Sequence, residues 1–276
     1  MNFIIYAPGD YTPNGGGCVA LHKLAHNIAE LGENTFIVCD SKNPNYKGVQ
    51  ITELEGQALA RYGAFVIYPE VIQGNPLNAR NVMRWILYNV RNYDNFGVFG
   101  ERDLIYKYAP MFSLRYGDTF DGELRAVELN LDLFKYRDSG GRSGSVHLYK
   151  KMGHKKNIHP EDSVLLDDYA AKGGNQYLSR VFRYAEIFYS YDSATWLSIM
   201  AALCGCVSVV VPDANVTPAE WYAKFPYFRY GIAYGMDEVP HALATAGKVR
   251  ANLLELEKQT ILQTKEFIDN AYKVRV

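Results

Sequence analysis

The chain has 276 residues, 48% of them hydrophobic and 21% charged, which is an ordinary composition for a folded protein and a suitable length for two compact domains. Its formal net charge of −1 provides no basic surplus, so we expect no nucleic-acid partner. No stretch approaches the roughly 18 apolar residues of a membrane span, and the first residues lack the pattern of a signal peptide, so we expect no integral membrane segment.

The cysteines and tyrosines narrow the class of protein further. Cys18, Cys39, Cys204 and Cys206 match neither a zinc pattern nor a disulfide framework, which is typical of a reducing compartment. We therefore expect a cytoplasmic protein. The 22 tyrosines exceed the 13 phenylalanines. A flat apolar ring with a polar tip suits contacts to sugars and bases, although most of these side chains are expected to belong to the core and surface.

The first part of the chain predicts the β-α-β opening of a doubly wound domain. Residues 3–7 and 35–39 form short apolar runs that are typical of buried strands. Between them, a loop over residues 8–17 ends in three glycines. Apolar residues then recur at helical spacing over residues 18–31, directly before Gly32, which favours the end of a helix.

The alternation of strands and helices continues less regularly. Residues 64–68 predict a strand, residues 79–88 a helix, and residues 96–100 and 110–114 two weaker strands. Residues 125–134 alternate between apolar and polar side chains, which is typical of a half-buried strand.

A flexible stretch, residues 138–144, predicts a junction between two domains, residues 1–137 and 138–276. Beyond it, we expect strands at residues 145–149, 163–166, 187–191 and 207–211, and helices at residues 175–185, 194–203 and 250–272. The predicted fold class is α/β, with two Rossmann-like doubly wound domains that face a cleft and a long C-terminal helix.

Residues 192–195 join a predicted strand to a predicted helix, at the sheet edge where open α/β folds bind ligands. The N–H groups and dipole of a helix N-terminus favour an anion. Tyr191 and Asp192 stand at the strand end, and Ser193 and Thr195 add hydroxyl groups. The alternative is that Asp192 or Ser193 is a plain helix cap.

Cations flank the first predicted strand of the second domain. Lys150 and Lys151 directly follow residues 145–149, and Arg142 precedes them. Such groups next to a helix N-terminus suit a diphosphate. As a lone charge pair the two lysines would be a solvated turn, so the prediction depends on their combination with the loop at residues 192–195.

The glycines Gly15, Gly16 and Gly17 permit close approach of a ligand or another segment to the first helix. They do not match the dinucleotide fingerprint, because no glycine stands three residues beyond Gly17 and Asp40 only weakly matches the ribose-binding acid. We therefore expect no nicotinamide cofactor. The sequence also contains no Walker A, nucleophile-elbow or H-E-x-x-H pattern.

Several segments resemble GT-B glycosyltransferases, especially those of the family-4 type. Gly15-Gly16-Gly17-Cys-Val-Ala-Leu-His22-Lys-Leu-Ala resembles their acceptor loop and first helix. The run from Phe188-Tyr-Ser-Tyr-Asp192 to Val-Val-Val-Pro212 resembles their donor segment, and Leu148-Tyr-Lys150-Lys151-Met-Gly153 their phosphate-binding pair. Tyr68-Pro69-Glu70 and the Gly-Ile-Ala-Tyr-Gly of residues 231–235 are similar to segments of sparsely characterised bacterial and phage glycosyltransferases.

This resemblance implies transfer of a sugar from a nucleotide-diphosphate-sugar donor to a glycan or other hydroxyl acceptor. The charge that develops on the leaving diphosphate must be neutralised. No Asp-x-Asp metal motif is present, and we expect cations to serve in place of a metal or a cofactor. The expected donor-binding residues are Arg142, Lys150, Lys151, Tyr191, Asp192, Ser193 and Thr195, and the expected acceptor loop is Gly15, Gly16 and Gly17.

One position departs from the family pattern. Retaining members carry two glutamates eight positions apart in the donor segment, where this chain has Asp192 and Met200. A thioether cannot accept a hydrogen bond from a ribose hydroxyl with comparable strength. Either the ribose is held elsewhere, or the donor carries a deoxynucleotide such as dTDP, or Met200 is simply a buried helix residue.

An inverting enzyme needs a base that takes the acceptor proton. Asp10, Glu70 and His22 lie in or next to loops of the first domain and are the candidates, each with a purely structural alternative. A retaining enzyme needs no such base, so both stereochemical outcomes stay open. The alternative functions are a non-catalytic nucleotide-sugar-binding protein and another sugar-nucleotide enzyme on the same scaffold.

Overall fold

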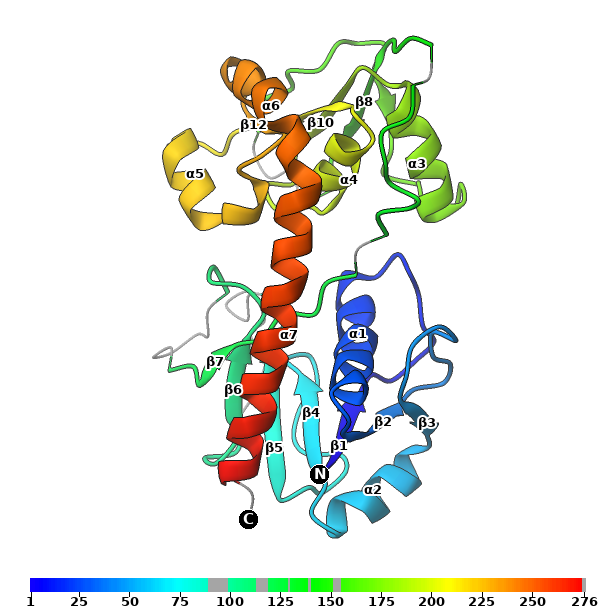
Figure 1. The fold of residues 1–276 in the computed structure, drawn as a ribbon, viewed down its shortest axis with the longest axis vertical. Coiled ribbons are helices and arrows are strands. Elements are labelled where there is room, and N and C mark those ends of the chain that lie inside the picture. Colours follow the sequence, from blue (N-terminus) through cyan, green and yellow to red (C-terminus); the bar gives the residue numbers. More distant parts are fainter. Residues whose placement is uncertain (89–98, 113–118, 129, 139, 151–154, 275–276) are drawn as a thin grey trace. The chain divides into compact units, whose positions relative to one another are not determined.

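The computed structural model describes residues 1–88, 99–112, 119–128, 130–138, 140–150 and 155–274 (Figure 1). The chain divides into two compact units. The first unit comprises Met1–Glu128 together with Glu257–Val276, and the second comprises Leu129–Leu256. No helix among the described residues combines the length and the apolar character needed to cross a membrane.

The first unit is built on a seven-stranded parallel sheet with the order β3-β2-β1-β4-β5-β6-β7. Its strands are β1 (Asn2–Tyr6), β2 (Asn34–Val38), β3 (Val49–Ile51), β4 (Phe65–Pro69), β5 (Asn81–Ile86), β6 (Leu104–Lys107) and β7 (Gly122–Glu123). Its helices are α1 (Gly16–Glu30), α2 (Glu53–Arg61) and the second part of α7 (Val249–Val274).

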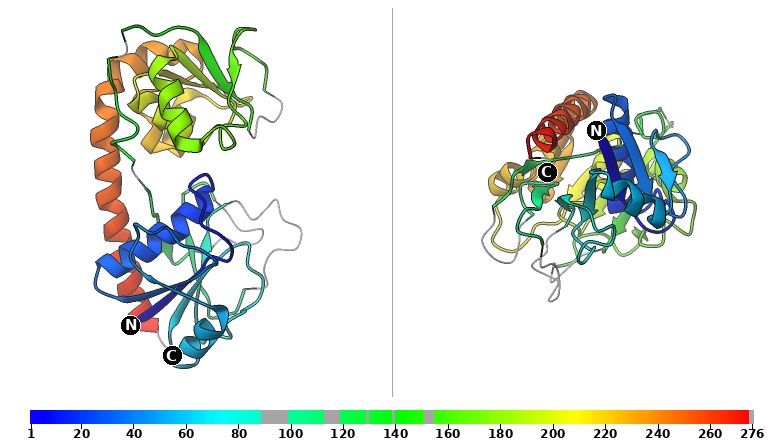
Figure 2. Two further views of the ribbon diagram at one scale, coloured as in Figure 1. Left: turned by 90° about the vertical axis from the view of Figure 1, so that its right-hand side faces the viewer. Right: turned by 90° about the horizontal axis from the view of Figure 1, so that it is seen from below.

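Side chains of β1 alternate between the two faces of this sheet, as the pleat of a strand requires. Phe3 and Ile5 pack into a core with α1 and with Phe267 of α7, so both helices cover the same face (Figure 2). Ile4 and Tyr6 pack into a second core on the other face, which includes Ala60 of α2. Because helices cover both faces, β1 is apolar from Phe3 onward and was recognisable as a buried strand.

The second unit is built on a five-stranded parallel sheet with the order β12-β11-β10-β8-β9. Its strands are β8 (Ser145–Leu148), β9 (Val164–Leu165), β10 (Ile187–Ser190), β11 (Val207–Val210) and β12 (Ile232–Tyr234). Its helices are α3 (Gly174–Tyr184), α4 (Leu197–Leu203), α5 (Pro218–Lys224), α6 (Val239–Thr245) and the first turns of α7, with short 3-10 turns at Pro226–Phe228, Met236–Glu238 and Ala246–Lys248.

Two cores cover the faces of the five-stranded sheet. Leu178 and Phe182 of α3 pack with Ala201 of α4 against β8 and β10 on one face. Ala242 of α6 packs against side chains of β10, β11 and β12, among them Val209, on the other. Both sheets are therefore parallel and helix-covered, and the predicted α/β fold class and long C-terminal helix are confirmed.

Most of the predicted elements are present, with ends that shift by a few residues. The confirmed strands are those expected at residues 3–7, 35–39, 64–68, 145–149, 163–166, 187–191 and 207–211, and the confirmed helices those at 18–31, 175–185 and 250–272. The helix expected at residues 194–203 is also present, but it begins only at Leu197.

The helix predicted at residues 79–88 is wrong, because this segment forms β5. All six residues of β5 are buried, since the strand lies between β4 and β6. A short run that is buried on all sides carries no period that would separate a strand from a helix.

The strand predicted at residues 125–134 is also wrong. Residues 125–128 lie in no strand of the sheet and residues 131–133 form a turn, so the backbone does not follow the pleat that the sequence suggested. Residues 110–112 of the weak strand at 110–114 contain a turn, and its remainder lies outside the described residues, as does most of the one at 96–100.

The expected boundary between the two domains, between residues 137 and 138, differs from the observed division into units. Residues 130–137 belong to the second unit, where Phe134 joins the core beside α3 and α4. The chain also returns to the first unit after Leu256, because Phe267, Ile268 and Ala271 of α7 complete the core against β1 and α1.

Candidate functional site

Each sheet has a position where the order of its strands reverses along the chain. In the first sheet β1 lies between β2 and β4, and in the second β8 lies between β9 and β10. The loops that follow the two strands at such a switch point diverge and leave a crevice at the carboxyl edge, where open α/β proteins bind ligands. The residues that follow β8 and β10 therefore form the candidate site.

A buried lysine joins the loops at this edge of the second sheet. The Nζ atom of Lys155 donates hydrogen bonds to Ser193 Oγ (2.6 Å) and to the carbonyl oxygen of Val211 (2.7 Å). It also forms an ion pair with Asp213 Oδ1 at 3.0 Å, and the Lys155 side chain is only 7% exposed. Ser193 Oγ in turn donates to Asp213 Oδ2 (2.6 Å). An ammonium group and a hydroxyl group are thus fixed at the ends of neighbouring strands.

The local conformation of the loop after β10 comes from its short polar side chains. Asp192 Oδ1 accepts a hydrogen bond from the N–H of Ala194 (3.0 Å), and Thr195 Oγ1 accepts one from the N–H of Leu197 (3.3 Å). Such side-chain bonds favour turns over helix. α4 therefore begins after this loop, and the helix N-terminus predicted at residues 192–195 is replaced by a turn. Ser193 of this loop contacts Lys155, whereas Asp192 and Thr195 accept hydrogen bonds from backbone N–H groups of the loop and the start of α4.

Four aromatic and imidazole rings pack beside this lysine network. The hydroxyl of Tyr191 lies 2.7 Å from His159 Nδ1, and the hydroxyl of Tyr149 lies 3.2 Å from His159 Nε2. His159 stacks on His147 with ring centroids 3.8 Å apart and an interplanar angle of 9°. Burial, and then the neighbouring His159, lower the pKa of His147 below its ordinary value. His147 is therefore neutral at pH 7, which allows the two imidazoles to stack.

The cations predicted to bind phosphate lie in different surroundings. Lys150 is exposed in the turn after β8, and Lys151 lies outside the described residues. Arg142 precedes β8 and therefore stands at the amino edge of the sheet, opposite to Lys155. Its guanidinium donates to the carbonyl oxygens of Phe182 (2.7 Å), Ala185 and Cys204, which end α3 and α4. Arg142 stabilises helix ends and does not join the carboxyl-edge group.

Met200 faces the apolar interior of the second unit. It lies within α4 and packs, half-buried, against the core that contains Phe182 and Phe188. This placement agrees with the simplest interpretation of Met200, a helix residue that contributes to packing.

In the first unit, the glycine triplet begins α1. Gly15 is the residue before the helix, and Gly16 and Gly17 form its first turn, where a loop was predicted. Because the residue at the cap position is glycine, no side chain there accepts a hydrogen bond from the first turn of α1. That turn also contains no acidic residue. A Cβ atom added to Gly16 would meet no atom within 4 Å. The first N–H groups of α1 are therefore not covered by a side chain of their own turn.

The three candidate bases occupy different surroundings. Asp10 is exposed and accepts a hydrogen bond from Ser41 Oγ (2.6 Å), which ties the loop after β1 to the loop after β2. Glu70 follows β4 and is buried, and its Oε2 atom accepts from the N–H of Leu87 (2.9 Å). Burial raises the pKa of Glu70 above its ordinary value, against the opposing effect of this N–H group.

His22 is the most enclosed of these candidates. It is 2% exposed, its ring packs edge-to-face on Tyr11 with centroids 4.9 Å apart, and its Nε2 atom has no hydrogen-bond partner among the described residues. Burial, with a smaller effect of Lys42, lowers the pKa of His22 to about 4. The imidazole is therefore neutral at pH 7.

Sequence reasoning missed Lys155, His159 and Asp213. Lys155 and Lys156 form a second lysine pair beyond the one that was noticed, and Asp213 directly follows Pro212 at the end of a predicted strand. Both signals are present in the sequence but are ordinary for solvated turns. Among the described residues, no three His, Cys, Asp or Glu side chains are grouped closely enough to hold a metal ion.

Comparisons with known proteins add no family to these observations. No protein-family model matches the chain, and no curated protein sequence matches it significantly.

Proposed function

We propose that the protein is a glycosyltransferase of the GT-B type, which transfers a sugar from a nucleotide-diphosphate sugar to a glycan or other hydroxyl acceptor. The observation that carries the proposal is the group formed by Lys155 and Ser193 at the switch point of the second sheet. A cation and a hydroxyl donor at this edge suit the phosphates of a nucleotide.

The buried ammonium of Lys155 is suited to a leaving diphosphate. Electrostatic stabilisation is strongest where donors are fixed before the reaction and screened from water. Lys155 meets both conditions, because three groups hold its Nζ atom and its side chain is almost buried. In the proposed reaction the bond between the anomeric carbon and the diphosphate oxygen breaks, and the acceptor oxygen becomes bonded to that carbon. Lys155 with Ser193 stabilises the negative charge on the departing diphosphate oxygen. Lys150, on the same loop, is the further candidate cation.

Two half-buried rings of this cluster, Tyr149 and His159, offer a surface for the nucleoside or the sugar, whereas the predicted donor-binding ring of Tyr191 is fully buried. Tyr149 and Tyr191 have ring centroids 5.0 Å apart and flank His159. Aromatic rings with polar tips present a flat apolar face and a hydrogen-bonding edge to such ligands. We assign Tyr149 and His159 to donor binding, and the buried Tyr191 to holding His159 in place.

The acceptor belongs to the first unit in this proposal. The uncovered start of α1 and the loops after β1 and β4 are the acceptor-side elements. In an inverting reaction a carboxylate or neutral imidazole must take the hydroxyl proton. Glu70 and His22 are the buried candidates, with Asp10 as the exposed one.

A thermal-shift screen of UDP, GDP and dTDP and of their sugar conjugates tests the proposal. A ligand that binds only the folded state raises the melting temperature. We expect at least one nucleotide diphosphate to do so, and its sugar conjugate to be consumed in the presence of a hydroxyl acceptor. No shift with any of these nucleotides would contradict the proposal. Binding without turnover would instead support a non-catalytic nucleotide-sugar-binding protein, the alternative that Met200 motivates.

A further inference from the structure

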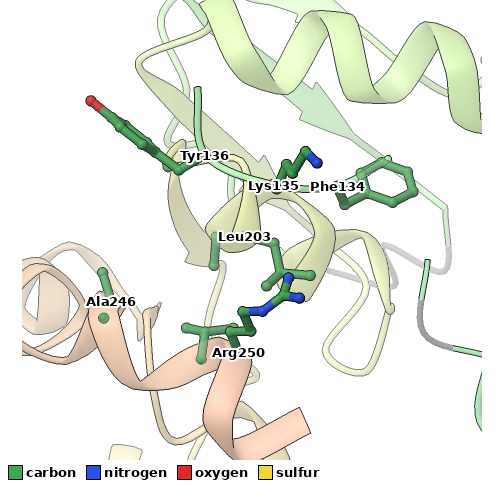
Figure 3. Close-up of a pocket in the computed structure, with 10 residues that line it drawn as sticks. Phe134, Lys135, Tyr136, Leu203, Ala246 and Arg250 are labelled. Carbon is green, nitrogen blue, oxygen red and sulfur yellow. The ribbon is translucent and has the colours of Figure 1, made fainter. Parts of the chain in front are cut away.

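A cavity of about 400 Å³ lies in the second unit, away from the carboxyl-edge residues described above. Its lining comes from three segments, namely residues 134–136, the end of α4 with the following turn, and the beginning of α7 with the turn before it (Figure 3). Gly205 precedes β11, so the cavity stands at the amino edge of the five-stranded sheet. Its volume is within the range of sites that hold small organic molecules.

The walls of the cavity are apolar. Phe134, Leu203 and Val249 contribute hydrocarbon side chains, and Ala202, Ala246 and two glycines leave the space between them open. Gly205 has a φ angle of +83°, and a Cβ atom added there would lie 2.6 Å from Tyr136 Cδ2. The Tyr136 ring therefore packs directly on the backbone at this position, which only glycine permits.

Two cations complete the lining, and none of the described lining residues is acidic. Arg250 donates one hydrogen bond, from Nη1 to the carbonyl oxygen of Leu131 at 3.4 Å. The Nζ atom of Lys135 lies 3.4 Å from Asp132 Oδ1, and the Asp132 side chain is 97% exposed. Such a solvated pair is weak, so an anion in the cavity can compete for the ammonium.

We propose that this cavity binds a small amphiphile, with an apolar chain or ring against Leu203 and Val249 and one anionic group beside Lys135 and Arg250. A neutral apolar molecule would leave Lys135 with only its solvated pair to Asp132 and would bring no counter-charge to Arg250. A highly charged nucleotide would leave the apolar walls in contact with polar atoms. This site does not depend on the proposed glycosyl transfer, because its residues are distinct from those at the carboxyl edge.

Titration of the full chain with decanoate, followed by calorimetry, tests the assignment, with decanol as the uncharged probe of equal length. We expect saturable binding of one decanoate per chain, and binding of decanol that is weaker by about fivefold, the upper effect of a solvated ion pair. Equal affinity for the two probes, or the absence of saturable binding, would overturn the proposal.

Substitutions of lining residues test whether decanoate binds in this cavity. Gly247 lines the cavity, and a Cβ atom added there meets no atom within 4 Å, so Gly247→Phe and Ala246→Phe should fill the space and abolish binding. Arg250→Gln removes an exposed charge and should weaken decanoate about fivefold without affecting decanol. Arg180→Gln, an exposed arginine on α3, is the matched control and should change nothing. Wild-type affinity in both Arg250→Gln and a folded filling variant would rule out this site.

Discussion

Lys155 and Asp213 form an ion pair of 3.0 Å in which the lysine side chain is 7% exposed and the aspartate side chain 43% exposed. The charge that is held from water is therefore the cation, while its partner remains partly accessible. This asymmetry suits a site that exchanges one anionic partner for another, because the ammonium stays in place when the carboxylate is replaced by phosphate.

Asp213 should contribute modestly to the stability of the second unit. Asp213→Asn keeps a hydrogen-bond acceptor for Ser193 but removes the charge that neutralises Lys155. We expect the free energy of unfolding to fall by about 1 kcal/mol, because the aspartate is partly solvated. Urea unfolding measures the change. A variant as stable as the wild type would show that the pair contributes nothing to the resting structure.

A larger loss of stability is expected in the first unit at Arg84. This arginine is 2% exposed, pairs with Asp103 at 2.7 Å, and donates to the carbonyl oxygens of Ile72 and Gly74. Arg84→Met leaves a carboxylate and two carbonyl groups without this donor, and should cost about 3–5 kcal/mol of unfolding free energy. Arg80→Met, at an exposed position, is the control. Equal urea midpoints for the two variants would contradict the prediction.

Glu70 should make the stability of the first unit depend on pH. Its pKa is raised by burial, so the folded protein binds this proton more tightly than the unfolded chain does. The resulting stabilisation is complete below the unfolded pKa, near 4.5, and is lost as pH rises through the raised folded value.

The variant Glu70→Gln removes this titration and keeps an oxygen for the N–H of Leu87. We therefore expect the stability of the Glu70→Gln variant, relative to that of the wild type, to increase as pH rises above 4.5. Melting temperatures across pH, with the exposed Glu101→Gln as control, measure the difference. A difference that does not change with pH would be inconsistent with a raised pKa.

His22 should make the stability of the first unit depend on pH in the opposite sense to Glu70. Burial lowers its pKa from 6.5 to about 4, so the unfolded chain binds the proton more tightly. The stability that this group contributes is present above pH 6.5 and is lost as pH falls toward 4. His22→Phe retains an aromatic ring against Tyr11 and should lose less stability over this interval. Parallel pH profiles for the two proteins would argue against a buried neutral imidazole.

The fold was predictable where hydrophobic pattern and length agreed. β1 and β10 are short apolar runs bounded by turns, and α7 is long enough to show its helical period. β5 was not predictable, because strands on both sides and cores on both faces bury every residue and erase the period. The division of α7 between the two units depends on tertiary packing of Phe267 and was not visible in its sequence.

The candidate site was only partly predictable. Ser193 was found because it follows a recognisable strand. Lys155 was missed because two lysine pairs follow β8, and only the path of the chain decides which ammonium reaches the neighbouring loop. Arg142 was misplaced, since a residue that precedes a parallel strand lies at the edge opposite to the residues that follow it. Its bonds to helix-end carbonyls depend on tertiary structure.

The most direct test of the account is the affinity of Lys155→Ala for UDP, GDP and dTDP, measured by calorimetry beside Lys156→Ala. The two lysines are adjacent, but Lys156 is exposed whereas Lys155 is held by Ser193 and Asp213. Loss of a charged hydrogen bond costs about 1.5–3 kcal/mol, so Lys155→Ala should weaken the bound nucleotide about tenfold or more. Lys156→Ala should bind as the wild type does. Equal nucleotide affinities in the wild type and both variants would contradict a diphosphate site at Lys155.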